Sequence, residues 1–345
     1  MRTETTRNGG HAASMLRFWH PVLSSRALPP GRAGAIELAG RKLALFRARN
    51  GQLGAIEDQC AHRRMKLSLG KVEEDRLICP YHGWSFTPDG QGESPSAPKM
   101  HACITSYDCA ETAGVIWIKA RGDGPPVPSL AMAGWIDVGA VFNRVRAPLE
   151  LVIDNFSEIE HTVTAHPDFG IDGARAAEAV VKLESTEDAI TVLNHGPAKM
   201  PPFDTRFAVW VRRGDLFHSN YTFHFDPPRS LVDHFWTNGA NGRERLLKYH
   251  VVHYFVPVAD RETSIVTFGF LKIRRPLLRL LGRQMRWLFR RKLRRTVDED
   301  AFLVENLADP STDLEGMTLS RFDRVLSLTR ERLTRIYLEG GCKQP

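Results

Sequence analysis

Residues 60–84 read CAHRRMKLSLGKVEEDRLICPYHGW, and they carry the clearest motif of the N-terminal part of the chain. It places one cysteine and one histidine on each of two loops, Cys60 with His62 and Cys79 with His82. Four such ligands can hold two irons and two sulfides, with both cysteines on one iron and both histidines on the other. Zinc also accepts two cysteines and two histidines, but zinc fingers usually pair the cysteines with each other. The mixed pairing therefore favours the iron–sulfur cluster.

The length and composition indicate a globular protein of two ordinary domains. The chain has 345 residues, of which 42% are hydrophobic and 25% are charged. No apolar run is as long as a membrane span, and residues 1–14 lack the apolar core of a signal peptide. Apart from the two loop cysteines the chain has only Cys103, Cys109 and Cys342, which argues against a disulfide framework. We therefore expect a cytoplasmic protein with a disordered leader at residues 1–14.

The net charge of +7 comes from one part of the chain. Residues 272–295 carry eleven lysines and arginines with interleaved leucines, and no acidic residue occurs between Glu262 and Asp298. A solvated helical face, a docking site for an acidic electron-transfer partner and a membrane-surface segment all fit this pattern. Docking of an electron-transfer partner is the functional reading that we prefer, and we expect neither nucleic-acid binding nor membrane association.

The N-terminal part predicts a small all-β domain. Short apolar runs lie at residues 35–38, 43–47, 53–56 and 115–118, and Asn50-Gly51 between two of them is a strong hairpin signal. Residues 122–128, a cluster of glycine and proline, then indicate a linker.

The part after the linker predicts an α+β domain with an antiparallel sheet. Apolar residues at helical spacing predict helices at residues 149–165, 277–308 and 320–338. Between the first two of these helices the pattern predicts strands at residues 179–183, 189–193, 207–211, 217–225, 231–236, 248–256 and 264–273.

A second group of metal ligands follows the linker. His161 and His166 are separated by four residues, and Glu158 lies one helical turn before His161. Pro167 forces the preceding residue out of the helical region, so the helix should end at His166 and free its ring to turn back. Two histidines and one carboxylate on one face of a metal are typical of mononuclear iron(II) oxygenases.

The helix predicted at residues 277–308 supplies the carboxylate. Leu293, Val297, Asp300, Val304 and Leu307 form one stripe, on which Asp300 is the acid. A carboxylate buried among apolar residues needs a metal or a counter-charge. The same periodicity predicts that Asp298, Glu299 and Glu305 point elsewhere.

These motifs together resemble the α-subunits of Rieske non-haem iron oxygenases, the family of aromatic-ring-hydroxylating dioxygenases and Rieske monooxygenases. The resemblance covers the chain from about Trp19 to the C-terminal helix. It implies an all-β Rieske [2Fe-2S] domain at residues 15–124 and a catalytic helix-grip (START-like) domain at residues 125–345. It also implies that the cluster is bound by Cys60, His62, Cys79 and His82, and the mononuclear iron(II) by His161, His166 and Asp300.

The resemblance also implies a role for Glu158. Family members usually carry aspartate three residues before the first iron-binding histidine, where it bridges to a cluster histidine of a neighbouring subunit. Glu158, which stands at that position here, is one methylene longer. Asp154 is the alternative bridge, and we favour Glu158.

The function implied by the resemblance is oxygenation of a small organic substrate with O2, by hydroxylation or by oxidative O- or N-demethylation. The chain has no flavin or nicotinamide fingerprint, so electrons from NAD(P)H would arrive through a separate flavin reductase, a ferredoxin or both. A homotrimer is the implied assembly. Two rival classes are a stand-alone Rieske electron carrier, which needs only the cluster, and a zinc-stabilised ligand-binding protein, which would be colourless.

Overall fold

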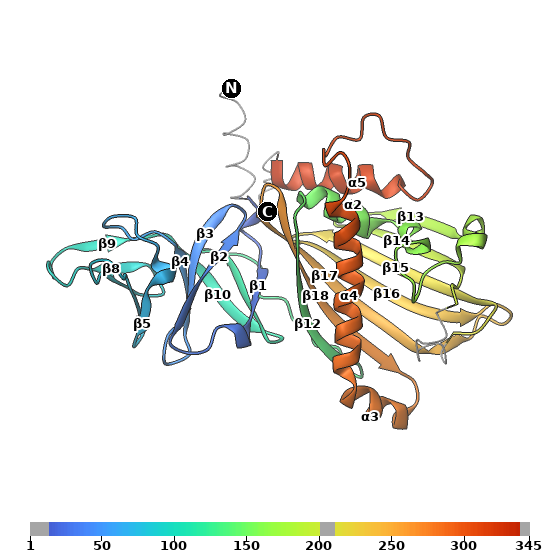
Figure 1. Ribbon diagram of the computed structural model, residues 1–345, viewed down its shortest axis with the longest axis horizontal. Coiled ribbons are helices and arrows are strands. Elements are labelled where there is room, and N and C mark those ends of the chain that lie inside the picture. Colours follow the sequence, from blue (N-terminus) through green and yellow to red (C-terminus); the bar gives the residue numbers. More distant parts are fainter. Residues whose placement is uncertain (1–13, 201–210, 339–345) are drawn as a thin grey trace. The chain divides into compact units, whose positions relative to one another are not determined.

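The structure, a computed structural model, describes residues 14–200 and 211–338 (Figure 1). Two compact units divide the chain: Met1–Leu130 with Val256–Asp260, and Ala131–Phe255 with Arg261–Pro345. Of the leader expected at residues 1–14, only Ser14 lies within the described residues. Of the strand expected at residues 207–211, only Val211 does. Among the helices that the structure describes, none is both long and apolar enough to cross a membrane.

The first unit is built from antiparallel sheets, as the sequence predicts. The six-stranded sheet has the order β1-β11-β10-β4-β3-β2 and consists of β1 (His20–Ser24), β2 (Arg32–Leu38), β3 (Arg41–Arg47), β4 (Leu53–Glu57), β10 (Ser106–Thr112) and β11 (Val115–Ala120). The five-stranded sheet follows chain order through β5 (Lys71–Glu73), β6 (Arg76–Ile78), β7 (Ser85–Phe86), β8 (Gln91–Glu93) and β9 (His101–Cys103). Two short 3-10 helices, η1 (Ser25–Ala27) and η2 (Leu67–Leu69), join these strands.

The Asn50-Gly51 hairpin is confirmed between β3 and β4. Gly51 has φ +94°, a conformation that favours glycine over residues with a side chain. The two strands pair from Leu43 with Glu57 to Arg47 with Leu53. Phe46, which has no exposed surface, packs in a cluster with Cys60 and Cys79, so the core of this unit supports the ligand loops directly.

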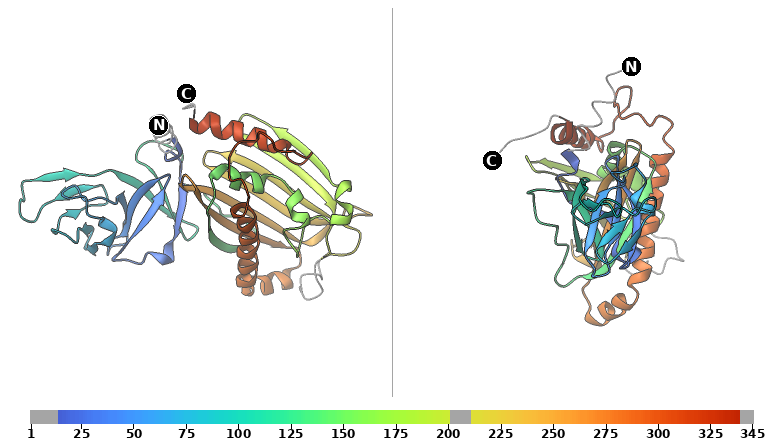
Figure 2. Two further views of the ribbon diagram at one scale, coloured as in Figure 1. Left: turned by 45° about the horizontal axis from the view of Figure 1, so that its top comes forward. Right: turned by 90° about the vertical axis from the view of Figure 1, so that its left-hand side faces the viewer.

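The second unit is an α+β domain around one seven-stranded antiparallel sheet, which confirms the predicted fold class. The sheet has the order β12-β18-β17-β16-β15-β14-β13 and consists of β12 (Ile136–Val145), β13 (Val180–Ser185), β14 (Ala189–Pro197), β15 (Asp215–Phe225), β16 (Pro228–Asn238), β17 (Glu244–Ala259) and β18 (Glu262–Ile273). The other elements are α2 (Leu149–Ser157), η3 (Glu160–Val163), η4 (Gly173–Glu178), α3 (Pro276–Gln284), α4 (Arg286–Glu305), α5 (Arg324–Leu333) and the π-helical turn η6 (Thr334–Leu338). Figures 1 and 2 show α4 lying across one face of this sheet.

Several predicted helix boundaries are wrong. The helix expected at residues 149–165 ends at Ser157, and Glu158 is extended, with φ −120° and ψ 160°. Its carboxylate accepts the His161 N–H at 3.0 Å, so it turns the chain into η3. The helix expected at residues 277–308 is broken at Met285 into α3 and α4, and the helix expected at residues 320–338 begins only at Arg324. Strand β12 was not predicted at all.

Candidate functional site

The two cysteine-histidine loops of the first unit have the same local design. Each cysteine N–H donates to a carbonyl oxygen a few residues ahead, from Cys60 to Met65 at 2.8 Å and from Cys79 to Trp84 at 2.7 Å. Each loop also contains a residue with positive φ, Arg64 at +58° and Gly83 at +68°. The backbone therefore closes each loop on itself and leaves the cysteine and histidine side chains on its inner side.

The four predicted cluster ligands meet between the loops. Cys60 and Cys79 are buried, whereas His62 and His82 are exposed, with 4.6 Å between their ring centroids. Burial raises the pKa of the Cys60 thiol, and the neighbouring Cys79 thiol raises it further. Two thiolates at this place therefore need positive charge between them, which a cluster with two irons supplies. The donor set fits the cluster, with its histidine side toward solvent.

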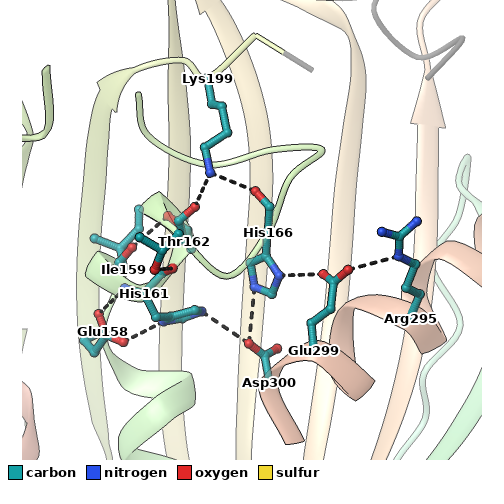
Figure 3. Close-up of polar contacts among 10 residues, drawn as sticks. Glu158, Ile159, His161, Thr162, His166, Lys199, Arg295, Glu299 and Asp300 are labelled. Atoms are coloured by element: carbon teal, nitrogen blue, oxygen red, sulfur yellow. Dashed lines mark hydrogen bonds and ion pairs between the residues drawn. The ribbon is translucent and has the colours of Figure 1, made fainter. Parts of the chain in front are cut away.

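The second predicted ligand group also comes together in the structure (Figure 3). Ligand atoms of His161, His166 and Asp300 all lie within 4.8 Å of one another. The Nε2 atoms of His161 and His166 lie 3.4 and 3.2 Å from the same Asp300 Oδ1. That oxygen is buried and has no hydrogen-bond partner among the residues that the structure describes, which is costly for a carboxylate without a bound cation. The residues therefore fit a metal ion held by two imidazoles and one carboxylate.

Each of the two histidines has a carboxylate on its other ring nitrogen. Glu158 Oε1 lies 2.6 Å from His161 Nδ1, and Glu299 Oε2 lies 3.0 Å from His166 Nδ1. Arg295 Nε donates to the second oxygen of Glu299 at 3.0 Å. Burial acts to lower the pKa of His161, but the hydrogen bonds and charge of Glu158 together with the charge of Asp300 outweigh it, and the pKa is raised. Both Nδ1 atoms are thus occupied, which leaves Nε2 of each ring for the metal.

The prediction that Glu299 points away from the site is wrong. Glu299 does lie off the buried stripe of α4, which contains Val297, Asp300 and Val304. His166, however, comes from a separate loop and presents its Nδ1 to the side of the helix, where the long Glu299 side chain meets it. Helical periodicity describes the face that a residue occupies but not which loop approaches that face. The alternative bridge Asp154 is held elsewhere, in a mostly buried ion pair with Arg330.

Lys199 holds the loop between the two histidines, and no sequence pattern predicts this role. Its Nζ donates to the carbonyl oxygens of Thr162 at 2.8 Å, Val163 at 2.7 Å and His166 at 2.8 Å (Figure 3). Partial burial lowers the pKa of this ammonium group. A single cation therefore satisfies three carbonyls of the segment that presents both imidazoles.

The ligand group forms part of the wall of a cavity between the sheet and α4. Several aromatic side chains line it, among them Phe156, Phe169, Tyr221, Trp236, Phe270 and Phe289. Lys292 also lines the cavity, and its Nζ lies 3.6 Å from Asp168. Such a concave, mostly apolar space beside a few polar groups is typical of small-molecule sites.

Comparison with known proteins gives the family. Residues 18–108 match the Rieske [2Fe-2S] domain, and residues 145–337 match the vanillate O-demethylase oxygenase C-terminal domain. The chain is 37% identical over 156 residues to chlorophyllide a oxygenase of Chlamydomonas reinhardtii. This match covers 43% of the present chain and 24% of the relative. It is 31% identical over 182 residues to the methylxanthine N1-demethylase NdmA of Pseudomonas putida, and this match covers 48% of the present chain and 52% of the relative.

The fold also resembles a solved structure over nearly its full length. Dicamba monooxygenase bound to dicamba superposes with a TM-score of 0.72 at 18% sequence identity, covering 94% of this chain and 98% of that one. The chain spans from about a quarter to about half of the length of the two curated relatives named above. Because the C-terminal match covers more than half of the chain and follows a Rieske match, this chain belongs to the Rieske oxygenases with a vanillate O-demethylase-type C-terminal domain.

Proposed function

We propose that this chain oxygenates a small, mainly apolar organic substrate with O2, by hydroxylation or by oxidative O- or N-demethylation. The observation that carries the proposal is the convergence of His161, His166 and Asp300 at the wall of an apolar cavity. An N1-demethylase and a dicamba monooxygenase among the similar proteins favour this reaction class. A stand-alone electron carrier needs no second ligand group and no cavity, so the second unit argues against that alternative.

Two metal groups would serve this function. Cys60, Cys79, His62 and His82 would hold the [2Fe-2S] cluster in a domain at residues 15–124. His161, His166 and Asp300 would hold iron(II) in a catalytic domain at residues 125–345. Bound at those places, the cluster supplies single electrons, and the iron, with three protein ligands, keeps open positions for oxygen and substrate. We propose that the electrons come from NAD(P)H through a separate flavin reductase, with or without a ferredoxin, in the cytoplasm.

The protein's own residues prepare the mononuclear site. Glu158 and Glu299 accept the Nδ1 protons of the two imidazoles and thereby fix which nitrogen faces the metal. Lys199 fixes the loop between them. The mostly apolar lining would favour an apolar substrate over water in the cavity, which would protect the reaction from competing solvent.

We also propose a homotrimer in which Glu158 connects His161 with the cluster histidine His82 of the neighbouring subunit. Two observations support this role: Glu158 already contacts His161, and His82 is exposed on the surface of the first unit.

Asp300→Ala tests the proposed function. The variant should keep the visible absorption of the cluster, lose the mononuclear iron and consume no oxygen with O-methylated or N-methylated aromatic test substrates. Glu305→Gln is the matched control, because Glu305 lies on the same helix but pairs with Arg146. Full iron content and substrate-dependent oxygen uptake in Asp300→Ala would refute the assignment.

A further inference from the structure

An exposed apolar and basic patch spans α3 and the start of α4. Its apolar members have large exposed fractions: Leu277 86%, Leu280 60%, Leu281 49%, Met285 37% and Trp287 60%. Large apolar side chains scattered singly on a surface are ordinary, but five within eleven residues are not.

These side chains are held outward by the packing of the same segment. Gly282 is buried, and a Cβ there would lie 2.6 Å from Ile273 Cδ1, so this side of α3 is pressed against the sheet. Leu278 and Phe289 pack against the core cluster that contains Ile136 and Ile273. The segment therefore already has a buried side, while its exposed apolar side chains, three on α3 and two at the start of α4, point to solvent. Figure 1 shows α3 beside the start of α4, where the chain leaves β18.

The arginines around this apolar face are exposed and positively charged without compensation. Residues 272–295 contain no acidic residue. Within the part of the chain that the structure describes, no ion pair involves Arg275, Arg283, Arg286, Arg290 or Arg291. An acidic protein partner would meet the same arginines, but leucines and a tryptophan interleaved with arginines along one short segment are the pattern of helices that lie at an anionic lipid surface. An isologous contact with a second copy would bring the two sets of arginines together, and a heterologous contact, as in a trimer, is tested below by oligomer mass.

We propose that this apolar–basic patch binds the surface of an anionic lipid bilayer. The leucines and Trp287 would enter the boundary between headgroups and acyl chains, and the arginines would contact the lipid phosphates. Phe289 and Leu293 of the same helix α4 line the cavity, so the patch and the cavity share one element. The proposal stands apart from the proposed function, because lipid binding needs no turnover, and it replaces the expectation that membrane association is absent.

Vesicle flotation of the full chain tests the proposal. Wild-type protein should float with phosphatidylcholine vesicles that contain phosphatidylglycerol and much less with phosphatidylcholine alone. Replacing Leu277, Leu281 and Trp287 together by serine should lower the partition coefficient by about tenfold or more. Replacing Arg283, Arg286 and Arg290 by glutamate should abolish the preference for anionic lipid. Because all six side chains are exposed, the visible absorption of the cluster should be unchanged and serves as the folding control.

A fluorescence signal separates insertion from loose electrostatic contact. Anionic vesicles should shift the tryptophan emission of the wild type to the blue, and Trp287→Phe should remove that shift although six other tryptophans remain. Three outcomes would overturn the proposal. One is that the wild type does not float. Another is that about 0.5 M salt abolishes flotation of the wild type while the serine variant floats as well as the wild type does. The third is a loss of oligomer mass in the serine variant, which would assign the patch to a contact between copies.

Discussion

At the scale of single residues, the proposed mononuclear site depends on its supporting carboxylates as much as on its ligands. Glu158 and Glu299 contact the Nδ1 atoms of His161 and His166, one carboxylate for each ring. A carboxylate in this position fixes the tautomer, orients the ring and makes the other nitrogen a better donor. Only Glu158 was predicted, because it lies close to His161 in the sequence, whereas 133 positions separate Glu299 from His166.

Glu299→Gln should weaken the mononuclear site without removing a ligand. The variant keeps the size of the side chain but loses the charge that faces His166, so we expect iron(II) to bind about 10- to 100-fold more weakly. Chelator competition measures this affinity, and the nitric oxide adduct of the iron reports its geometry by electron paramagnetic resonance. The cluster spectrum should stay parental, as should the iron affinity of the control Glu305→Gln. If Glu299→Gln bound iron(II) with the parental affinity, the Glu299 carboxylate would have no role in supporting the metal ligand His166.

At the scale of elements, the sequence predicted the regular parts and failed where single side chains redirect the chain. The strands around Tyr221 and Val251 alternate between buried and partly exposed residues or form long apolar runs, and they were found. Strand β12 was missed because Gly139, with φ +89°, and a register shift between Asp137 and Gly139 interrupt its pattern. The end of α2 was missed because the Glu158 carboxylate, not periodicity, decides it.

The loop between the two histidines depends on a contact that no sequence pattern predicts. Lys199→Met removes the ammonium group and leaves the carbonyl groups of Thr162, Val163 and His166 without this donor. Loss of these charge-assisted bonds should lower the free energy of unfolding by about 2 kcal/mol or more. Denaturant unfolding measures the change, and loss of iron from the mononuclear site should precede it. Lys182→Met is the control, because Lys182 is exposed and pairs only with Glu184; equal effects of the two substitutions would contradict the role of Lys199.

At the scale of the whole molecule, each unit holds one complete ligand group, so the two groups need a connecting residue. In the proposed trimer that residue is Glu158, whose side chain is mostly buried and touches His161 through both oxygens, one at Nδ1 and one at the backbone N–H. Asp154 is unsuited to the task because Arg330 already holds it. We therefore propose Glu158 rather than Asp154 as the bridge in this trimer, although the resemblance implies an aspartate, one methylene shorter, at its position.

Glu158→Gln should separate electron delivery from metal binding. The amide keeps the length of the side chain but removes the negative charge that can hold two imidazoles at once. Iron(II) should bind more weakly, as in Glu299→Gln, so the rate is measured at saturating iron(II), where both metal groups are filled and the cluster is still reduced. Electron transfer to the mononuclear site should then fall by about 10- to 100-fold, as expected when an outer partner of a metal ligand is lost. Glu158→Asp should remain active.

Glu160→Gln is the control for this prediction, since the Glu160 side chain is exposed and accepts a hydrogen bond from Ser320 instead. Single-turnover kinetics of the pre-reduced protein, followed by cluster absorption, gives the rate. Oxidation of the cluster at the parental rate in Glu158→Gln would show that electrons reach the iron by another route.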